Sequence, residues 1–121
     1  MPESARARLV YKGRTEDSCI TGPNKRWTHS PSFPLQHGVA YTFGRGRDAD
    51  IHFFSNTIAR LHMQVVWSTL SHNHEHRLLI LDLQSTNGIS YQQERKKTLS
   101  LVTGECFQVA ESFEFEFVVE E

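Results

Sequence analysis

The sequence predicts an all-β domain folded as an antiparallel β-sandwich. Hydrophobic side chains recur with a period of two in several segments, which is the spacing that turns one face of a strand toward a core. Turn-forming pairs such as Asn87-Gly88 and Thr103-Gly104 separate these segments. No segment of about ten residues has the spacing of an amphipathic helix. Many short strands at close spacing favour a sandwich.

The clearest strand covers residues 112–119. Phe113, Phe115 and Phe117 alternate there with Glu114 and Glu116. A helix would spread the three phenylalanines around its circumference, whereas a strand places them on one face. This segment therefore predicts a strand with one buried and one solvated face.

Two more long strands follow from the same argument. Residues 61–67 alternate, which predicts that Leu61 and Met63 are buried and that His62 lies on the opposite face. Residues 77–83 are nearly all apolar, as expected for a strand covered on both sides. Shorter strands are predicted at 8–11, 40–43, 49–53, 88–91, 97–101 and 105–109.

The remaining segments are predicted to be loops of one domain, residues 1–121. Residues 21–38 are rich in Pro, Ser, Gly and His and are interpreted as a long exposed loop or insertion. Residues 71–76 are interpreted as a polar hairpin loop, and residues 92–97 as a surface segment with a brief helical turn. Because the chain ends directly after a core strand, we expect a fragment of a larger protein.

Composition limits the classes of function. The net charge of −1 over 121 residues provides no global field to attract nucleic acid or an acidic membrane. The two cysteines lack metal-ligand spacing and suit a reducing, intracellular compartment rather than a disulfide framework. No apolar stretch approaches the roughly 18 residues of a membrane span.

Two turns carry side chains suited to an anion. Gly44-Arg45-Gly46 follows one predicted strand, and the guanidinium of Arg45 could grip two phosphate oxygens as a fork. The alternative is a surface arginine paired with Asp48 or Asp50. Arg47 and Arg60 either add to the positive patch, in contact with a bound peptide, or remain solvated.

The second turn follows residue 83. Ser85 and Thr86 offer hydroxyl and backbone donors to a phosphate, while the amide of Asn87 could hold the main chain of a bound peptide. Turn chemistry alone also explains Asn87-Gly88, because Asn-Gly is favoured in tight hairpins. The two interpretations are compatible.

Nothing in the chain indicates an enzyme. The sequence has no nucleophile elbow, Walker loop or HExxH motif. His62 could be read as a general base, but nothing places it in a catalytic set. His72, His74 and His76 resemble a metal tract without forming a closed ligand set, so we expect neither a metal nor a cofactor.

Together these motifs resemble the forkhead-associated (FHA) domain, a module that reads phosphothreonine, over residues 40–119. The family's Gly-Arg falls on Gly44 and Arg45, and its Asp-x-x-Ser-x-Asn-Gly falls on residues 82–88. The Ser-x-x-His motif falls on residues 59–62, an acidic-aliphatic pair on 50–51, and a terminal Gly-Asp on 104–105. The resemblance implies a sandwich of about eleven strands, a phosphothreonine peptide as partner, and an architectural role for His62.

The chain departs from the family at Ala59, where the family has a serine whose hydroxyl touches the phosphate. Ser55, Asn56 or Thr57 could supply a substitute donor if their loop bends inward. A lost donor to a charged acceptor costs about 1–3 kcal/mol. The alternative is therefore a phosphate-independent interaction or dimerisation module with a degraded pocket.

The resemblance also implies a context for the domain. Domains of this family often stand at the N-terminus of checkpoint- or meiosis-type signalling kinases, which would mean a nuclear role in the DNA damage response if the source is eukaryotic. Self-association is a further expectation for a module of this kind.

Overall fold

The computed structural model describes residues 5–12, 20–21, 32–53, 57–110 and 113–120. These residues form twelve strands and no helix, so none of them belongs to a helix able to cross a membrane. The strands are β1 (Arg6–Tyr11), β2 (Ile20–Thr21), β3 (Ser32–Leu35), β4 (Ala40–Gly44), β5 (Ile51–Phe53), β6 (Met63–Thr69), β7 (His76–Asp82), β8 (Ile89–Tyr91), β9 (Glu94–Lys96), β10 (Thr98–Leu101), β11 (Cys106–Val109) and β12 (Phe113–Glu120).

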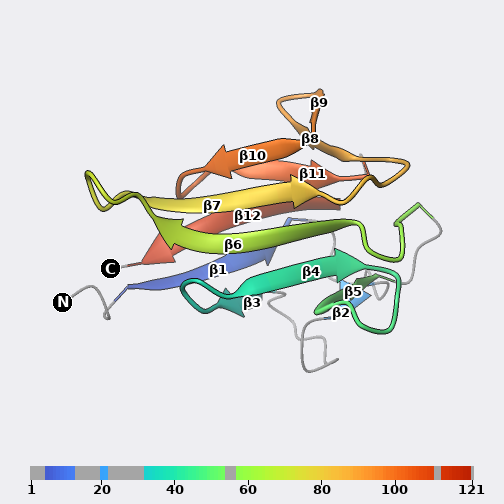
Figure 1. The fold of residues 1–121 in the computed structure, drawn as a ribbon, viewed down its shortest axis with the longest axis horizontal. Coiled ribbons are helices and arrows are strands. Elements are labelled where there is room, and N and C mark those ends of the chain that lie inside the picture. Colours follow the sequence, from blue (N-terminus) through green and yellow to red (C-terminus); the bar gives the residue numbers. More distant parts are fainter. Residues whose placement is uncertain (1–4, 13–19, 22–31, 54–56, 111–112, 121) are drawn as a thin grey trace.

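The strands form the two layers of a sandwich (Figure 1). One sheet has the order β3-β1-β12-β11-β8-β9, and the other has the order β10-β7-β6-β4-β5-β2. The predicted all-β sandwich is confirmed. One pair departs from the antiparallel prediction, because β4 and β5 run parallel, with Phe43 opposite Ile51. The loop between β4 and β5 brings the chain back so that β5 runs in the same direction as β4. Local sequence patterns do not indicate the relative direction of two strands.

The core lies between the sheets and is rich in aromatic rings. Phe115 of β12 is fully buried, and its ring centroid lies 5.3 Å from those of Tyr11 and Phe43 and 5.7 Å from that of Phe107. Burying a side chain of this size contributes roughly 1.5–3 kcal/mol. The alternation at 112–119 is confirmed over β12, since Phe113 and Phe115 are buried while Glu114 is exposed.

The prediction that residues 77–83 are covered on both sides is wrong. In β7, Leu78 and Ile80 are buried, but Leu79 and Leu81 are 43% and 45% exposed. The sandwich has two layers, so the outer face of each sheet meets water. A continuous apolar run cannot distinguish that arrangement from a strand between two layers.

The predicted phase of residues 61–67 is correct only from Met63 onward. β6 begins at Met63, and the alternation Met63, Val65, Trp67 faces the core. Leu61 precedes the strand and is 52% exposed, whereas His62 is fully buried. The chain turns before β6, so the period of two does not extend back to these residues.

Two predicted loops contain strands. Within 21–38, β3 pairs with β1 and buries Phe33 and Leu35, while Pro34 points outward at the sheet edge, where its missing N–H is tolerated. Within 92–97, β9 pairs with β8, so the predicted helical turn is wrong. The hairpin loop predicted at 71–76 does connect β6 and β7, although His76 already belongs to β7.

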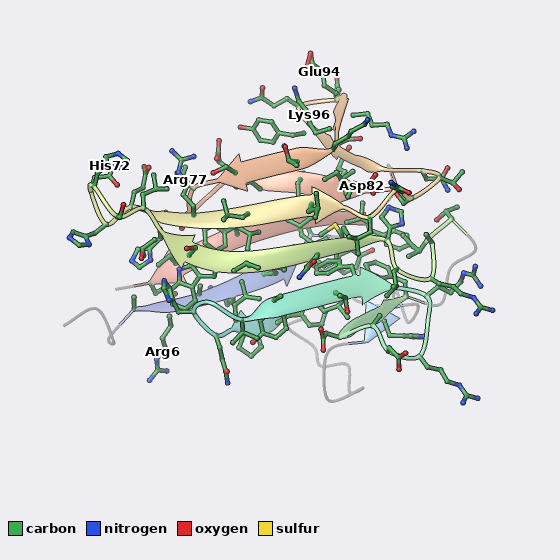
Figure 2. The ribbon with its side chains drawn as sticks, in the orientation of Figure 1. Arg6, His72, Arg77, Asp82, Glu94 and Lys96 are labelled. Atoms are coloured by element: carbon green, nitrogen blue, oxygen red, sulfur yellow. The ribbon has the colours of Figure 1, made fainter. Side chains whose placement is uncertain are left out.

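The topology gathers three loops at one end of the sandwich. β4 and β7 run in the same direction because each pairs antiparallel with β6. The chain therefore leaves β4, enters β6 and leaves β7 at the same end, on the right of Figure 1. β1 begins and β12 ends at the opposite end, where Arg6 lies opposite Glu120 in the pairing of the two strands. Figure 2 shows Asp82 at the first end and Arg6, His72 and Arg77 at the other.

Candidate functional site

The 44–46 turn is fastened to the segment that precedes β6. Three donors meet three successive carbonyl oxygens: Arg45 Nε lies 3.0 Å from Ile58 O, Arg45 N lies 2.9 Å from Ala59 O, and Gly46 N lies 3.1 Å from Arg60 O. This ladder of three hydrogen bonds engages one guanidinium nitrogen of Arg45, Nε. Among the residues that the structure describes, the two Nη atoms of Arg45 have no hydrogen-bond partner, and the side chain is exposed. The guanidinium of Arg45 is therefore fixed through Nε, and its two Nη atoms remain available to a ligand.

Gly44 is required by this close approach. A Cβ on Gly44 would overlap the carbonyl oxygen of Arg60. Any side chain at this position would push the two segments apart and break the ladder that orients Arg45. The glycine is therefore structural, as its place in the motif suggests.

The 85–88 turn is organised by the side chain of Ser85. Its Oγ donates to Asp82 Oδ1 at 2.5 Å and accepts from Gly88 N at 2.9 Å. Ser85 is 6% exposed, so its hydroxyl belongs to the interior of the turn, in contrast to the phosphate contact expected from the sequence. Gly88 has a φ of 72°, a conformation that favours glycine.

His62 joins this turn to the segment before β6. Ala59 N donates to Nδ1 at 3.1 Å, so Nε2 carries the proton and donates to Gly88 O at 2.8 Å. The backbone of His62 also bonds to Phe43 O and Leu83 N. Both ring nitrogens of His62 are engaged and the side chain is fully buried. His62 therefore positions the backbone and is not available as a general base.

Asn87 closes the arrangement from the other side. Its Nδ2 donates to Thr57 O at 2.7 Å, the carbonyl next to the one that holds Arg45. The two motifs identified in the sequence therefore converge on adjacent carbonyls of one segment. In this structure the Asn87 amide holds that segment, whereas the sequence suggested that it would hold a bound peptide.

An open pocket of about 580 Å3 lies beside this ladder. It is lined by Arg45, Gly46, Arg47, Asp48, Arg60 and Leu61. Three guanidinium groups and one carboxylate give the lining a local positive charge within a chain of net charge −1. Such a surface suits an anionic ligand.

The other predicted site residues lie as follows. Thr86 is exposed, and neither its N–H nor its hydroxyl has a partner among the described residues. Thr57 is exposed at the start of the segment that Asn87 holds. Ala59 is half-buried beside His62. Ser55 and Asn56 lie outside the described residues.

Sequence reasoning missed Arg95. Its Nη2 donates to Ser85 O at 3.1 Å, and its guanidinium occupies the place where a Cβ on Gly88 would stand. It reaches the turn because β9 folds back along β8, with Ser90 opposite Arg95. If residues 92–93 had been recognised as a hairpin turn, the return of Arg95 along β8 toward the 85–88 turn could have been predicted.

The histidine tract lies far from these loops. His72 and His74 are exposed in the β6–β7 loop, and His76 Nδ1 accepts a hydrogen bond from Trp67 Nε1 at 3.1 Å. Within the described residues no group of three or more His, Cys, Asp and Glu side chains is arranged to hold a metal.

Tyr91 and Glu105 form a separate polar pair. Tyr91 Oη lies 2.6 Å from Glu105 Oε2, and Val102 N lies 2.8 Å from Glu105 Oε1. The bond from Tyr91, followed by the backbone bond from Val102, lowers the pKa of Glu105, and the same contact with Glu105 raises the pKa of Tyr91.

Several known proteins resemble this chain in sequence or in fold. The FHA domain family model matches residues 41–109, and no curated protein matches the chain. The chain is similar to the FHA domain of CT664 from Chlamydia trachomatis, at 20% identity over 93% of this chain and 96% of that chain, with a TM-score of 0.68.

Two further solved structures contain peptides. EmbR of Mycobacterium tuberculosis, in complex with a low affinity phosphopeptide, matches at 26% identity over 93% of this chain and 24% of that chain, with a TM-score of 0.63. The MEK1 FHA domain, in complex with a HOP1 phosphothreonine peptide, matches at 14% identity over 95% of this chain and 97% of that chain, with a TM-score of 0.66.

Proposed function

Because the chain belongs to the FHA domain family, we propose that it is a binding module, not an enzyme, and that it recognises phosphothreonine in partner proteins. The observation that carries the proposal is Arg45, whose base is fixed on Ile58 O while its two Nη atoms extend toward solvent. A guanidinium held in this way presents a preorganised fork to a phosphate dianion. Thr86 adds a hydroxyl and an N–H from the neighbouring turn.

The residues around the fork suit the peptide that carries the phosphate. Arg47 and Arg60 are exposed and line the same pocket as Arg45. After the phosphate is bound by Arg45, these two cations favour acidic side chains elsewhere in the peptide. The partner we propose is therefore an acidic phosphothreonine segment.

The cellular setting of the proposal follows from the family alone. Phosphothreonine partners are made by intracellular kinases, so we place the domain inside the cell, and in the nucleus with a role in the DNA damage response if the source is eukaryotic. Neither nucleic acid nor membrane is part of the proposal.

Titration of a threonine-centred peptide library, phosphorylated and unphosphorylated, tests the function. We expect the phosphorylated peptides alone to bind. Arg45→Ala should remove binding and lower the melting temperature only slightly, because the exposed side chain carries little packing and loses one structural hydrogen bond, from Nε to Ile58 O. Arg6→Ala removes the same charge at the opposite end and is the matched control. Equal binding of both peptide forms would refute the proposal.

A second candidate is a phosphate-independent interaction or dimerisation module, and Ala59 favours it. Alanine provides no hydroxyl where the family uses one. If the pocket is intact apart from this donor, Ala59→Ser should tighten phosphopeptide binding about fivefold, equivalent to ~1 kcal/mol. If the second candidate is correct, Ala59→Ser changes nothing and the unphosphorylated partner binds as well.

A further inference from the structure

The orientation of Thr86 depends on a single peptide plane, the one that joins Ser85 to Thr86. In a trans peptide the C=O and N–H groups point in opposite directions. Whatever holds the carbonyl of Ser85 therefore also sets the direction of the Thr86 N–H. In this structure that group is Arg95, whose Nη2 lies 3.1 Å from Ser85 O.

Arg95 lies on the side of the turn away from the pocket. It comes from β9, at the edge of the sheet that contains β8, whereas Asn87 and His62 connect the turn to residues 57–62 on the other side. With the Ser85 carbonyl turned toward Arg95, the Thr86 N–H is turned away from β9. Among the described residues that N–H has no acceptor.

We infer that Arg95 is a positioning residue for phosphate recognition, which rests on the proposed function. It acts through two contacts. The first is the charged hydrogen bond to Ser85 O, and the second is the packing of its guanidinium against Gly88, in the space that the side chain of any other residue at position 88 would need. The positive charge on the carbonyl also polarises the peptide group and makes the Thr86 N–H a stronger donor. Arg95 itself does not touch the phosphate.

The test uses three variants of the whole chain. Arg95→Met keeps an unbranched side chain and removes the donor and the charge, and Arg95→Lys keeps the charge and a donor. Lys96→Met is the control, because it removes the same charge from the next residue, whose side chain pairs with Glu94 at 3.0 Å (Figure 2).

In the free protein we expect Arg95→Met to shift the carbonyl carbon-13 resonance of Ser85 and the amide nitrogen-15 resonance of Thr86, while Lys96→Met leaves both in place. With a phosphothreonine peptide, Arg95→Met should weaken binding about tenfold, the size of one charge-assisted hydrogen bond. Arg95→Lys should recover part of that loss. A general loss of folding would instead lower the melting temperature and disturb resonances across both sheets.

The two proposals can fail separately. If the wild-type chain binds no phosphopeptide, the proposed function and the role of Arg95 in it are overturned, while the Ser85 and Thr86 resonances still report whether Arg95 sets the peptide plane. If the wild-type chain binds and Arg95→Met binds equally well with unchanged Ser85 and Thr86 resonances, the positioning role is wrong.

Discussion

Two turns follow each other along the chain, and they are stabilised in different ways. The 85–88 turn has glycine where φ is positive and is tied by the buried side chains of Ser85 and His62. The 92–93 turn, which joins β8 to β9, has Gln92 and Gln93 at φ of 53° and 67°. Such values cost non-glycine residues about 1–2 kcal/mol each.

The difference shows which turn is defined by its own residues. The 85–88 turn is held in one shape by hydrogen bonds from its own side chains and from two other segments. The 92–93 turn is held by the strands it connects, since β8 and β9 pair on either side of it and Tyr91 bonds to Glu105. Changes in the first turn should therefore be costly, and changes in the second should be mild or even favourable.

The largest effect is expected from His62→Ala. Loss of the imidazole leaves Gly88 O with one fewer donor and Ala59 N without an acceptor, and opens a buried cavity. We expect the free energy of unfolding to fall by about 3 kcal/mol, with loss of phosphopeptide binding. Urea unfolding and peptide titration measure the two effects. His72→Ala, in an exposed loop, is the control, and an equal stability of both variants would contradict this account.

Ser85→Ala should have the next largest effect. It removes the acceptor of the buried Gly88 N–H and the donor to Asp82, for an expected loss of about 1–2 kcal/mol. Ser68→Ala, on the outward side of β6, should be nearly neutral. If Ser85 instead contacts phosphate directly, Ser85→Ala would lower affinity with no change in urea unfolding.

Gln93→Gly, in the 92–93 turn, should raise the stability, in contrast to the changes in the 85–88 turn. It relieves a positive φ, so we expect a gain of about 1 kcal/mol in unfolding free energy, reduced by the extra freedom of glycine in the unfolded chain. Gln108→Gly in the regular strand β11 should instead destabilise by about 0.5–1 kcal/mol. Destabilisation by both variants would show that the 92–93 turn carries no relievable strain.

The smallest effect concerns pH and the Tyr91–Glu105 pair. The pKa of Glu105 is lowered in the folded protein, so its contribution to stability is present above the ordinary glutamate value of about 4.3 and is lost as pH falls through the folded-state value. The stability gap between wild type and Glu105→Gln should therefore narrow below about pH 4.3. Urea unfolding at several pH values measures it, with Glu94→Gln as control. A gap independent of pH would mean that the carboxylate charge is irrelevant.

Much of the fold could be predicted because local spacing encodes it. The alternation in β6 and β12 reports a strand with one buried face, and the glycine turns mark where strands end. The edge strands β3 and β9 were missed, since they are short and their composition is that of a loop. The exposure of Leu79 and Leu81 depends on the number of layers, which no local pattern contains.

The candidate site divides in the same way. Arg45, Thr86 and Asn87 could be proposed from their motifs because residue type and order mark them. The structure brings Arg45 and Asn87 to adjacent carbonyls, while the binding roles of all three residues stay predictions. The inward position of Ser85 and the contact of Arg95 depend on how a turn is folded and on what a later hairpin brings back to it. Long-range contacts of this kind become visible only when the strands are assembled.

The position of β12 has a consequence for how the protein acquires this structure. β12 lies in the interior of its sheet, where it pairs with β1 on one side and β11 on the other. Among the described strands β1 comes first in the sequence and β12 comes last, whereas β3, the other partner of β1, follows soon after it. Loops of this length close slowly, so folding should be limited by the arrival of β12 and not by local steps. Until then the edge of β1 that β12 covers stays unpaired, and unpaired strand edges of this kind are prone to aggregate.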